Sequence, residues 1–412
     1  MAVPGYRVAA SSGAGAADGG VRRRRLLVPI ASRYLGGAEL HTAALARHLG
    51  ERGFAVLCAL DRDACAPELV ERFVLPGLVF GEAAVAWDPD LPAAANHRRQ
   101  REAVADLLRG YPVDGVLLPV SWPRHATGLL ECLAHARVPT LVVFHQAPEE
   151  PNLEPAERAV VDLSVHRPVA VSEDLAERVR ALYGLPRGAV LVVPNGVPAP
   201  EPLTGEERRC LRRRVRRAFG MPPEASLVLT VARFAESKGY DDLVRVAARL
   251  VPEDPDLHFL CIGDGPMRSA VVARLREQGL VRQVHCPGSF RDVSPYYRAA
   301  DVFFLPTRRE GHSLSLTEAA AFGLPLVTTT VSGQDRLLTG TGAAILVPPG
   351  AVADMSAALG RLLRDRGLAA DMGRRAAAWA SGACVREMHA RYAWLMDLTL
   401  AGQSHRVDLN HR

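Results

Sequence analysis

The segment 305–319 holds the densest group of side chains that could do chemistry. It reads Leu-Pro-Thr-Arg-Arg-Glu-Gly-His-Ser-Leu-Ser-Leu-Thr-Glu-Ala. An apolar run ends at Leu305, Glu310 follows in a loop, and we expect a helix to begin near Ser315 with Glu318 in its first turn. Glu310 could accept hydrogen bonds from sugar hydroxyls, and Glu318 could reach a ribose diol of the same ligand. The alternative is structural, because Ser315 and Glu318 also fit a helix-capping arrangement.

The start of this helix is also a candidate phosphate site. The first amides of a helix lack partners within the helix, and the positive end of the helix dipole lies there. Together they attract phosphate. The candidate binding residues in this stretch are Gly311, His312, Ser313, Leu314 and Ser315.

Two cations follow the apolar run 227–232. Arg233 and Lys238 are five residues apart in a segment that we expect to be a loop. Cleavage of a sugar–phosphate bond builds negative charge on the departing nucleotide diphosphate. A guanidinium and an ammonium can stabilise that charge without a metal ion. In the alternative interpretation, Lys238 lies on a solvated loop and Arg233 forms an ordinary surface ion pair.

The first half of the chain offers fewer candidates. Gly36 and Gly37 separate the first strand from the first helix, where a missing Cβ lets backbone amides approach a ligand. They also fit a helix-entry turn. His145 directly follows an apolar run, and Asn195 precedes a glycine. A histidine after a strand is often only structural, and Asn-Gly often forms a simple turn.

Other chemistries have weaker support in the sequence. Gly263 and Gly265 begin a possible dinucleotide fingerprint, but Arg268 stands where its third glycine belongs. The triplets 61–63 and 88–90 read Asp-x-Asp without further ligands nearby, which is typical of loops. Zinc-protease, serine-hydrolase and P-loop patterns are absent from the sequence. We therefore predict that the protein uses neither a metal nor a bound cofactor.

Apolar runs alternate with helix-length amphipathic segments along the chain, which indicates two α/β domains with parallel sheets. In such sheets ligands bind beyond the carboxyl ends of the strands, where the candidates above are expected. The predicted strands are 26–30, 54–60, 113–119, 138–144, 168–171, 190–193, 227–232, 258–262, 284–287, 302–305, 326–328 and 344–347. The predicted helices of the first half are 39–51, 96–109 and 125–136.

The chain divides at a segment rich in proline and glycine, 194–205. We predict a flexible tail over 1–21, a first Rossmann-like domain over 22–197, a second over 198–383, and a final helix with a tail over 384–412. Residues 208–217 carry seven arginines. A solvated helix that leads into the second domain is favoured there over a membrane-surface helix.

Composition indicates a cytoplasmic enzyme or binding protein. The formal net charge is +5, with 23% charged residues, which suits small anionic ligands better than nucleic acid. Seven cysteines without a C-x-x-C pair indicate reduced thiols. The sequence shows no secretory signal pattern and no apolar stretch of membrane-spanning length.

The ordered motifs resemble those of retaining GT-B glycosyltransferases of family 4 (glycosyltransferase group 1). Glu310-Gly311 and Glu318-Ala319 have the spacing of the family's paired-glutamate signature. The segment 231–240 is similar to its arginine–lysine–glycine element, with Ala232 in place of a glycine. Four shorter matches are 36–39, 193–197, 262–266 and 287–288. The resemblance covers roughly residues 25–380 and is strongest over 227–330.

The resemblance implies two Rossmann-like domains that face each other across a cleft, with the last helix returning to the first domain. The first domain binds the acceptor and the second binds a UDP- or GDP-type sugar donor. Transfer then retains the anomeric configuration and needs no metal. Arg233 and Lys238 hold the leaving phosphate, Glu310 orients the sugar hydroxyls, and Glu318 binds the ribose. His145 is implied to be a catalytic residue that lines the reaction centre and contacts the donor sugar. The remaining implied donor contacts come from Gly36, Gly37, Asn195, Gly263, Gly265 and the 311–315 segment.

Two departures from the family pattern bear on donor identity. Ser313 stands where many members have glycine, and His312 where many have an aromatic residue. The acceptor stays open, from a glycan or lipid to an antibiotic aglycone, and so does peripheral membrane contact. An epimerase or phosphorylase of the same architecture, a non-catalytic nucleotide-sugar binder and an NAD-dependent oxidoreductase are the alternatives.

Overall fold

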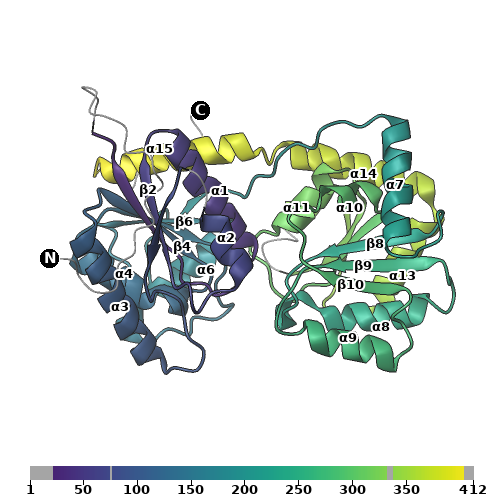
Figure 1. The fold of residues 1–412 in the computed structure, drawn as a ribbon, viewed down its shortest axis with the longest axis horizontal. Coiled ribbons are helices and arrows are strands. Elements are labelled where there is room, and N and C mark those ends of the chain that lie inside the picture. Colours follow the sequence, from purple (N-terminus) through teal and green to yellow (C-terminus); the bar gives the residue numbers. More distant parts are fainter. Residues whose placement is uncertain (1–21, 75–76, 332–336, 403–412) are drawn as a thin grey trace. The chain divides into compact units, whose positions relative to one another are not determined.

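The computed structural model describes residues 22–74, 77–331 and 337–402. The predicted flexible tail 1–21 lies outside these ranges. The chain forms two compact units (Figure 1). The N-terminal unit comprises Met1–Pro194 with Glu387–Arg412, and the C-terminal unit comprises Asn195–Arg386. The C-terminal unit therefore begins at residue 195, where we predicted 198. The final segment that rejoins the N-terminal unit begins at 387, where we predicted 384.

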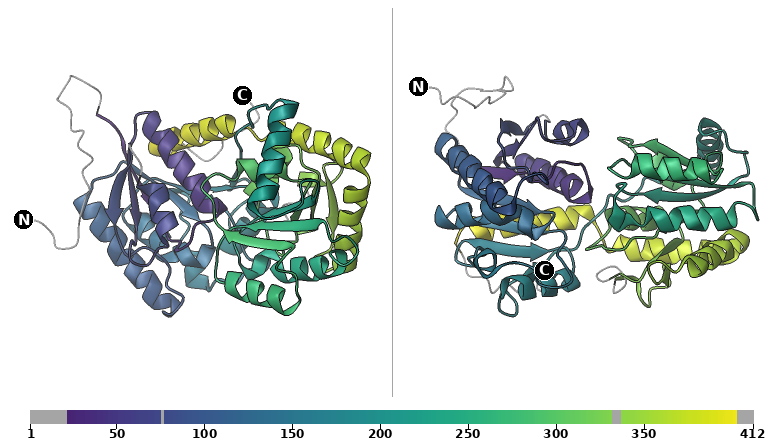
Figure 2. Two further views of the ribbon diagram at one scale, coloured as in Figure 1. Left: turned by 45° about the vertical axis from the view of Figure 1, so that its right-hand side comes forward. Right: turned by 90° about the horizontal axis from the view of Figure 1, so that it is seen from below.

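The N-terminal unit is built on a parallel seven-stranded sheet in the order β3-β2-β1-β4-β5-β6-β7. The reversal of strand order beside β1 is that of a Rossmann-like sheet. Its central strands are apolar runs because helices cover both faces (Figure 2). The strands are β1 Arg25–Pro29, β2 Ala55–Leu60, β3 Val79–Glu82, β4 Gly115–Val120, β5 Thr140–Phe144, β6 His166–Ala170 and β7 Leu191–Val192.

The last helix of the chain belongs to this N-terminal unit, as predicted. α15 (Val385–Leu400) packs the Tyr392 ring edge-on against His41 at 5.2 Å. Leu400 lies over Gly115, where an added Cβ would be only 2.4 Å from the leucine Cδ2. The other helices are α1 Gly37–Glu51, α2 Pro67–Phe73, α3 Ala93–Gly110, the 3₁₀ turn η1 Pro123–Ala126, α4 Thr127–His135, α5 Pro155–Arg158 and α6 Glu173–Tyr183.

The C-terminal unit contains a second parallel sheet in the order β10-β9-β8-β11-β12-β13. Strand residues alternate between two cores. Val228 packs with α8, α9 and α13 in one core, and Leu227 and Leu229 pack with α7, α10, α11 and α14 in the other. The strands are β8 Ser226–Val231, β9 Leu257–Ile262, β10 Val284–Gly288, β11 Val302–Leu305, β12 Leu326–Thr329 and β13 Ala344–Val347.

Helices of the C-terminal unit connect the strands, and the short 3₁₀ turn η2 lies at the predicted site. They are α7 Gly205–Ala218, the 3₁₀ turn η2 Glu236–Lys238, α8 Tyr240–Leu250, α9 Arg268–Glu277, α10 Ser294–Ala299, α11 Leu314–Ala321, α13 Val352–Arg364 and α14 Arg366–Ser381. Within the described ranges, no helix is long and apolar enough to cross a membrane.

The structure departs from the sequence prediction in several places. Strand β3 and helix α2 were not predicted, because both are short and β3 contains a glycine and a glutamate. The arginine-rich helix is only partly solvated. Arg216 is 1% exposed and donates from Nη2 to Asp301 Oδ2 at 2.9 Å. The predicted linker is also part of the C-terminal unit up to the start of α7, since Val197 pairs with Cys384 in a parallel bridge.

Candidate active site

Lys238 and Glu310, predicted from different motifs, meet at the carboxyl edge of the second sheet. Lys238 ends the η2 turn after β8, and Glu310 lies in the loop after β11. The lysine Nζ donates a hydrogen bond to Glu310 Oε1. Both side chains are largely removed from water, with 15% of the lysine and 6% of the glutamate side chain exposed. Such a pair places a carboxylate and an ammonium where a sugar phosphate could bind both.

Lys238 is also the only lysine in the 412 residues, where the sequence otherwise uses arginine as its strong base. An ammonium is a compact charge with three rotatable donors, whereas a guanidinium is a planar fork. A site that needs a compact cation beside a carboxylate would therefore not accept arginine equally well.

Gly239 allows the β8 and β11 loops to approach closely. It has φ +69°, and an added Cβ would lie 1.8 Å from the Pro306 carbonyl oxygen. The loops are joined by hydrogen bonds from the Arg308 amide to the Ser237 carbonyl at 2.7 Å and from Thr307 Oγ1 to the same oxygen at 2.9 Å. Without a glycine at 239, the lysine and the glutamate could not be held together in this way.

Arg233 lies at the same edge, next to the glycine pair that follows β9. Gly263 has φ +142°, and an added Cβ would lie 2.0 Å from the Ala232 carbonyl oxygen. A Cβ on Gly265 would lie 3.0 Å from Arg233 Cγ. The glycines thus let the end of β9 pack against the end of β8. Within the described ranges Arg233 forms no ion pair, so its half-buried guanidinium is available for an anion.

Helix α11 begins one turn away from Glu310, and its N-cap is Ser313 rather than the predicted Ser315. The Ser313 hydroxyl accepts a hydrogen bond from the Leu316 amide at 3.4 Å. The capping arrangement of Ser315 with Glu318 is therefore wrong. Leu314 and Ser315 form the first turn, whose amides have no helical partner and can face an anion. Ser313, the predicted departure from the family pattern, thus has a structural role as the cap of this helix.

His312 and Asn195 form hydrogen bonds with each other, so the His312 ring does not face an open pocket. The Asn195 amide donates to His312 Nδ1 at 3.1 Å, and Asn195 Nδ2 donates to the His312 carbonyl at 3.0 Å. His312 Nε2 lies 3.1 Å from Thr317 Oγ1. Because Nδ1 accepts a hydrogen bond, the neutral ring carries its proton on Nε2. Both ring nitrogens are engaged, so His312 positions the Gly311–Ser313 turn from beneath.

Glu318 is the fifth residue of α11, beyond the first turn in which it was predicted, and it contacts Tyr297 of α10. The tyrosine hydroxyl donates to Glu318 Oε2 at 2.8 Å and lies 3.1 Å from the Ser315 carbonyl oxygen. Burial raises the pKa of the Glu318 carboxyl, and the tyrosine hydrogen bond partly opposes this shift. Glu318 therefore keeps one carboxylate oxygen that tyrosine does not occupy, as a diol-binding group requires.

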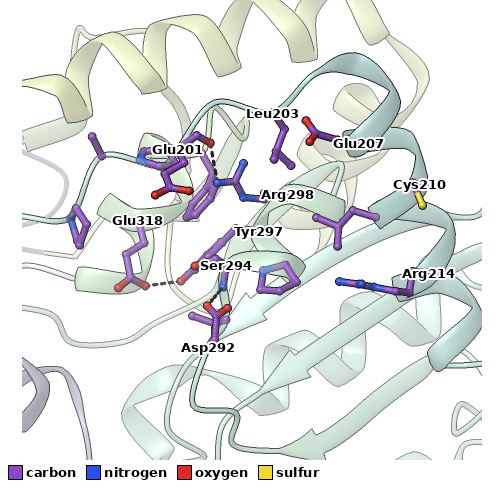
Figure 3. Close-up of a pocket in the computed structure, with 17 residues that line it drawn as sticks. Glu201, Leu203, Glu207, Cys210, Arg214, Asp292, Ser294, Tyr297, Arg298 and Glu318 are labelled. Carbon is purple, nitrogen blue, oxygen red and sulfur yellow. Dashed lines mark hydrogen bonds between the residues drawn. The ribbon is translucent and has the colours of Figure 1, made fainter.

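Glu318 is one wall of a cavity of about 660 Å³ in the C-terminal unit (Figure 3). The cavity volume is in the range of small-molecule sites. Arg298 on its rim donates to the Glu201 carbonyl at 2.7 Å and packs over the Phe322 ring. The lining comes from the 198–203 segment, α7, the loop before α10, α10 and α11. Lys238 and Glu310 do not line this cavity, so it neighbours the predicted phosphate site rather than containing it.

In the N-terminal unit, His145 follows β5 and is buried. Its amide donates to the Val120 carbonyl at 2.9 Å, and its ring lies edge-on to His41 at 5.0 Å. Burial lowers the pKa of the imidazole to about 4, so the ring is neutral at physiological pH. Its Nε2 is buried without a hydrogen-bond partner among the described residues. Gly36 and Gly37 form the N-cap and first residue of α1.

The two Asp-x-Asp triplets lie in loops, where protein groups engage their first carboxylates. Asp61 Oδ1 accepts from the Ala64 amide at 3.2 Å. Asp88 Oδ1 accepts from the Asp90 amide at 3.1 Å and from Arg33 Nη1 at 3.3 Å. These contacts explain both triplets as turns.

The predicted residues are therefore divided between two sheet edges. The C-terminal unit gathers Arg233, Lys238, Asn195, Gly263, Gly265, Glu310, Glu318 and the 311–315 turn, and the N-terminal unit holds Gly36, Gly37 and His145. Sequence reasoning missed Tyr297 and Thr317 as parts of the site, and it included Gly239 only as part of the 231–240 motif. For Tyr297 no local signal exists, because it contacts Glu318 only through the fold.

Comparison with known protein families matches both halves of the chain. The family model described as "Glycosyl transferases group 1" matches residues 225–365, and "Glycosyltransferase Family 4" matches residues 35–199. The first match spans the Lys238 and Glu310 loops. The second contains Gly36, Gly37 and His145.

Curated relatives are similar over parts of the chain. D-inositol 3-phosphate glycosyltransferase of Kribbella flavida is 26% identical over 377 residues, covering 84% of this chain and 87% of the relative. The enzyme of that name from Nocardia farcinica is 32% identical over 57% of this chain, which spans 53% of that relative. The 2-deoxystreptamine N-acetyl-D-glucosaminyltransferase of Niallia circulans is 36% identical over 31% of this chain and 34% of its own length.

Solved structures share the fold at low sequence identity. Sucrose-phosphate synthase from Thermosynechococcus elongatus has a TM-score of 0.74 at 18% identity, covering 92% of this chain and 100% of that one. Anabaena HepE in complex with UDP-glucose has a TM-score of 0.74 at 18% identity, covering 90% and 99%.

Proposed function

Because the chain belongs to the family 4, group 1 glycosyltransferases, we propose that it transfers a sugar from a nucleoside diphosphate sugar to an acceptor hydroxyl. The observation that carries this proposal is the Lys238–Glu310 pair, held beside the amide-presenting start of α11. The donor is of the UDP or GDP type. HepE, which shares the fold, was crystallised with UDP-glucose, and this supports a uridine nucleotide.

We propose that transfer retains the anomeric configuration. The acceptor oxygen bonds to the anomeric carbon on the face from which the phosphate leaves. The bond between that carbon and the phosphate oxygen breaks, and the acceptor proton passes to the departing phosphate. Lys238 and the unpaired guanidinium of Arg233 stabilise the charge that develops on the diphosphate. Glu310 orients the sugar hydroxyls and holds Lys238 in place.

These two cations supply the charge stabilisation that a metal ion gives in other transferases, so we propose a metal-independent reaction. His145, neutral because its pKa is lowered by burial, is assigned to the sugar side of the reaction centre with Gly36 and Gly37. Asn195 and His312 position the Gly311–Ser315 turn, whose amides bind the sugar phosphate.

The nucleoside is assigned to the cavity beside Glu318. The ribose diol donates hydrogen bonds to the carboxylate oxygen that Tyr297 leaves unoccupied. This role requires the ionised carboxyl, whose pKa is raised by burial. Donor affinity should therefore fall on acidification at a higher pH than for an ordinary glutamate.

The acceptor class is supported only by the relatives. Two of them are named for D-inositol 3-phosphate and one for 2-deoxystreptamine, which are both cyclitols. We propose a small polyhydroxylated acceptor, in glycan or secondary-metabolite biosynthesis. All seven cysteines are free thiols, which supports a reducing, cytoplasmic location. An epimerase or phosphorylase is not favoured, because these relatives are named as transferases.

The test is donor binding in EDTA, measured as thermal stabilisation by a panel of nucleoside diphosphates and their sugars. We expect one base to raise the melting temperature of the wild type, with the shift lost in Arg233→Ala and Glu318→Gln. The matched controls are Arg249→Ala and Glu277→Gln, two exposed residues of the same unit, which should keep the shift. No shift with any nucleotide would overturn the proposal.

The same donor is then supplied with 2-deoxystreptamine, D-inositol 3-phosphate and myo-inositol, with and without Mg²⁺. Product formation in EDTA supports the metal-independent reaction, and loss of activity in EDTA that Mg²⁺ restores contradicts it. The anomeric configuration of the product, read by NMR coupling constants, decides retention. Sugar release without any acceptor would favour a phosphorylase or hydrolase instead.

A further inference from the structure

Glu39 is a buried carboxylate at the carboxyl edge of the first sheet, outside the residues assigned above. It lies in the first turn of α1, and only 5% of the residue is exposed. The positive end of the helix dipole stabilises an ionised carboxyl at this position. A charge this far removed from water ordinarily requires an opposite charge or several hydrogen bonds.

The protein itself satisfies this carboxylate only in part. Ser121, directly after β4, donates its hydroxyl to Glu39 Oε1 at 2.8 Å. Among the described residues, no Lys, Arg or His nitrogen lies within 4.0 Å of the carboxylate. Oε2 lies beside Gly36, where an added Cβ would be 3.0 Å away. Glycine at 36 thus leaves space beside the second oxygen that the Cβ of any other residue would occupy.

The neighbouring cations are already committed to other carboxylates. Arg33, after β1, pairs with Asp88 at 3.3 Å, and Arg124, after β4, pairs with Glu157 at 3.4 Å. Arg62, after β2, is exposed and stands between two aspartates in the sequence. This edge therefore presents an unneutralised carboxylate, whereas its arginines beside β1 and β4 have their charge balanced.

We propose that Glu39, together with Ser121, binds a protonated amino group of the acceptor, which makes the acceptor an amine-bearing polyol. The inference rests on the proposed transferase function. An ammonium group has three donors and supplies the opposite charge that the buried carboxylate lacks. A phosphate group on the acceptor would instead meet a like charge at short range. Glu39 is thus a specificity-determining residue for the acceptor.

The experiment measures acceptor affinity by calorimetry with the full chain saturated with nucleoside diphosphate. The probes are 2-deoxystreptamine, with two amines, and myo-inositol, which has hydroxyls only. We expect the wild type to bind the amine more tightly. Glu39→Gln should weaken amine binding about 10- to 100-fold, because a hydrogen bond to a charged group is lost. It should change myo-inositol binding less than about 3-fold and leave the nucleotide-induced thermal shift unchanged.

Glu51→Gln, an exposed glutamate at the other end of α1, is the matched control and should bind both probes like the wild type. Ser121→Ala provides a second, milder variant, expected to weaken amine binding a few-fold, if Glu39→Gln does not fold. Equal affinity of the wild type for both probes, or amine binding that survives in Glu39→Gln and Ser121→Ala, overturns the inference. The same titrations are repeated without nucleotide. Absence of a nucleotide-induced thermal shift in the wild type would count against the transferase function, whereas the nucleotide-free titrations still test the role of Glu39.

Discussion

The carboxyl edges of the two sheets carry opposite kinds of charge. In the C-terminal unit, Lys238 and Arg233 follow β8, and the first turn of α11 follows the neighbouring strand β11, so cations and helix amides that attract anions share one edge. In the N-terminal unit, the buried Glu39 lacks a cationic partner within the described ranges, while Arg33 and Arg124 are neutralised by carboxylates. Similar sheets have therefore been given different chemistry by the residues that follow their strands.

The edges also differ in how rigidly the protein itself holds the groups that could react. In the C-terminal unit, the Arg308 amide and the Thr307 hydroxyl both donate to the Ser237 carbonyl and so join the β8 and β11 loops, and Gly239 packs against Pro306. Among the described residues of the N-terminal unit, a single hydrogen bond, from Ser121, holds the Glu39 side chain. An edge that stabilises transition-state charge benefits from such preorganisation. An edge that selects among acceptors depends more on which acceptor group forms hydrogen bonds with its unsatisfied carboxylate.

The largest expected effect is on turnover, from Lys238→Arg. We predict a fall in kcat of about 10²–10³-fold, because the guanidinium cannot place a compact charge between Glu310 and the leaving phosphate. Steady-state kinetics with the donor found by the binding panel measure it. Arg249→Lys, an exposed change on α8, is the control. Activity within a few-fold of wild type in Lys238→Arg would show that charge alone suffices at this edge.

The next effect is on stability and tests how tightly the C-terminal edge is held. Gly239→Ala should lower the free energy of unfolding by about 3 kcal/mol or more, because a positive φ and a backbone clash act together. Gly220→Ala has a similar φ, +66°, with nothing within 4 Å of the added Cβ, and should cost only about 1–2 kcal/mol. Urea denaturation compares them. Equal decreases in unfolding free energy for the two variants would mean that Gly239 does not pack closely against Pro306.

The smallest effect is pH-dependent and concerns the N-terminal edge. Burial lowers the pKa of His145 from 6.5 to about 4, so the folded state favours the neutral ring. Its stabilising contribution is present above pH 6.5 and lost as the pH falls towards 4, by at most about 3 kcal/mol. His145→Gln should flatten the dependence of unfolding free energy on pH in that window. His135→Gln, at an exposed histidine of α4, should not.

In the C-terminal unit, Glu318 makes the unfolding free energy depend on pH in the opposite direction to His145. Its pKa is raised by burial, so its contribution to stability is present below about pH 4.5 and lost as the pH rises through the raised value. The uncharged form is the one that the fold favours in both cases. A wild-type stability curve without either trend would contradict the burial of these two groups.

Much of the fold and of the C-terminal site was predictable from the sequence. The central strands are apolar runs because both faces of a parallel sheet are covered, and this pattern is visible without a structure. Lys238 and Glu310 lie in the loops that follow β8 and β11, which are neighbouring parallel strands, so their placement at one edge follows from the order of the strands. Short β3 has no such pattern and was missed.

The remaining contacts depend on residues that are distant in sequence. Ser313 rather than Ser315 caps α11, and the choice depends on where the chain turns into the helix. Asn195 meets His312 across 117 positions of sequence, and Tyr297 meets Glu318 across 21. Side-chain hydrogen bonds of this kind leave no periodic or local signal, so sequence reasoning assigned His312 to the sugar pocket without seeing that its ring is engaged.

The sequence by itself predicted two parallel-sheet domains and the glycosyltransferase family, because these depend on hydrophobic periodicity and on short motifs. Only the tertiary structure decided that Lys238 pairs with Glu310, and that Glu39 is buried with one hydrogen bond among the described residues. Burial and partner choice are properties of packing. They arise when distant segments exclude water from each other. The charges at the two sheet edges therefore differ because their burial and their partners differ.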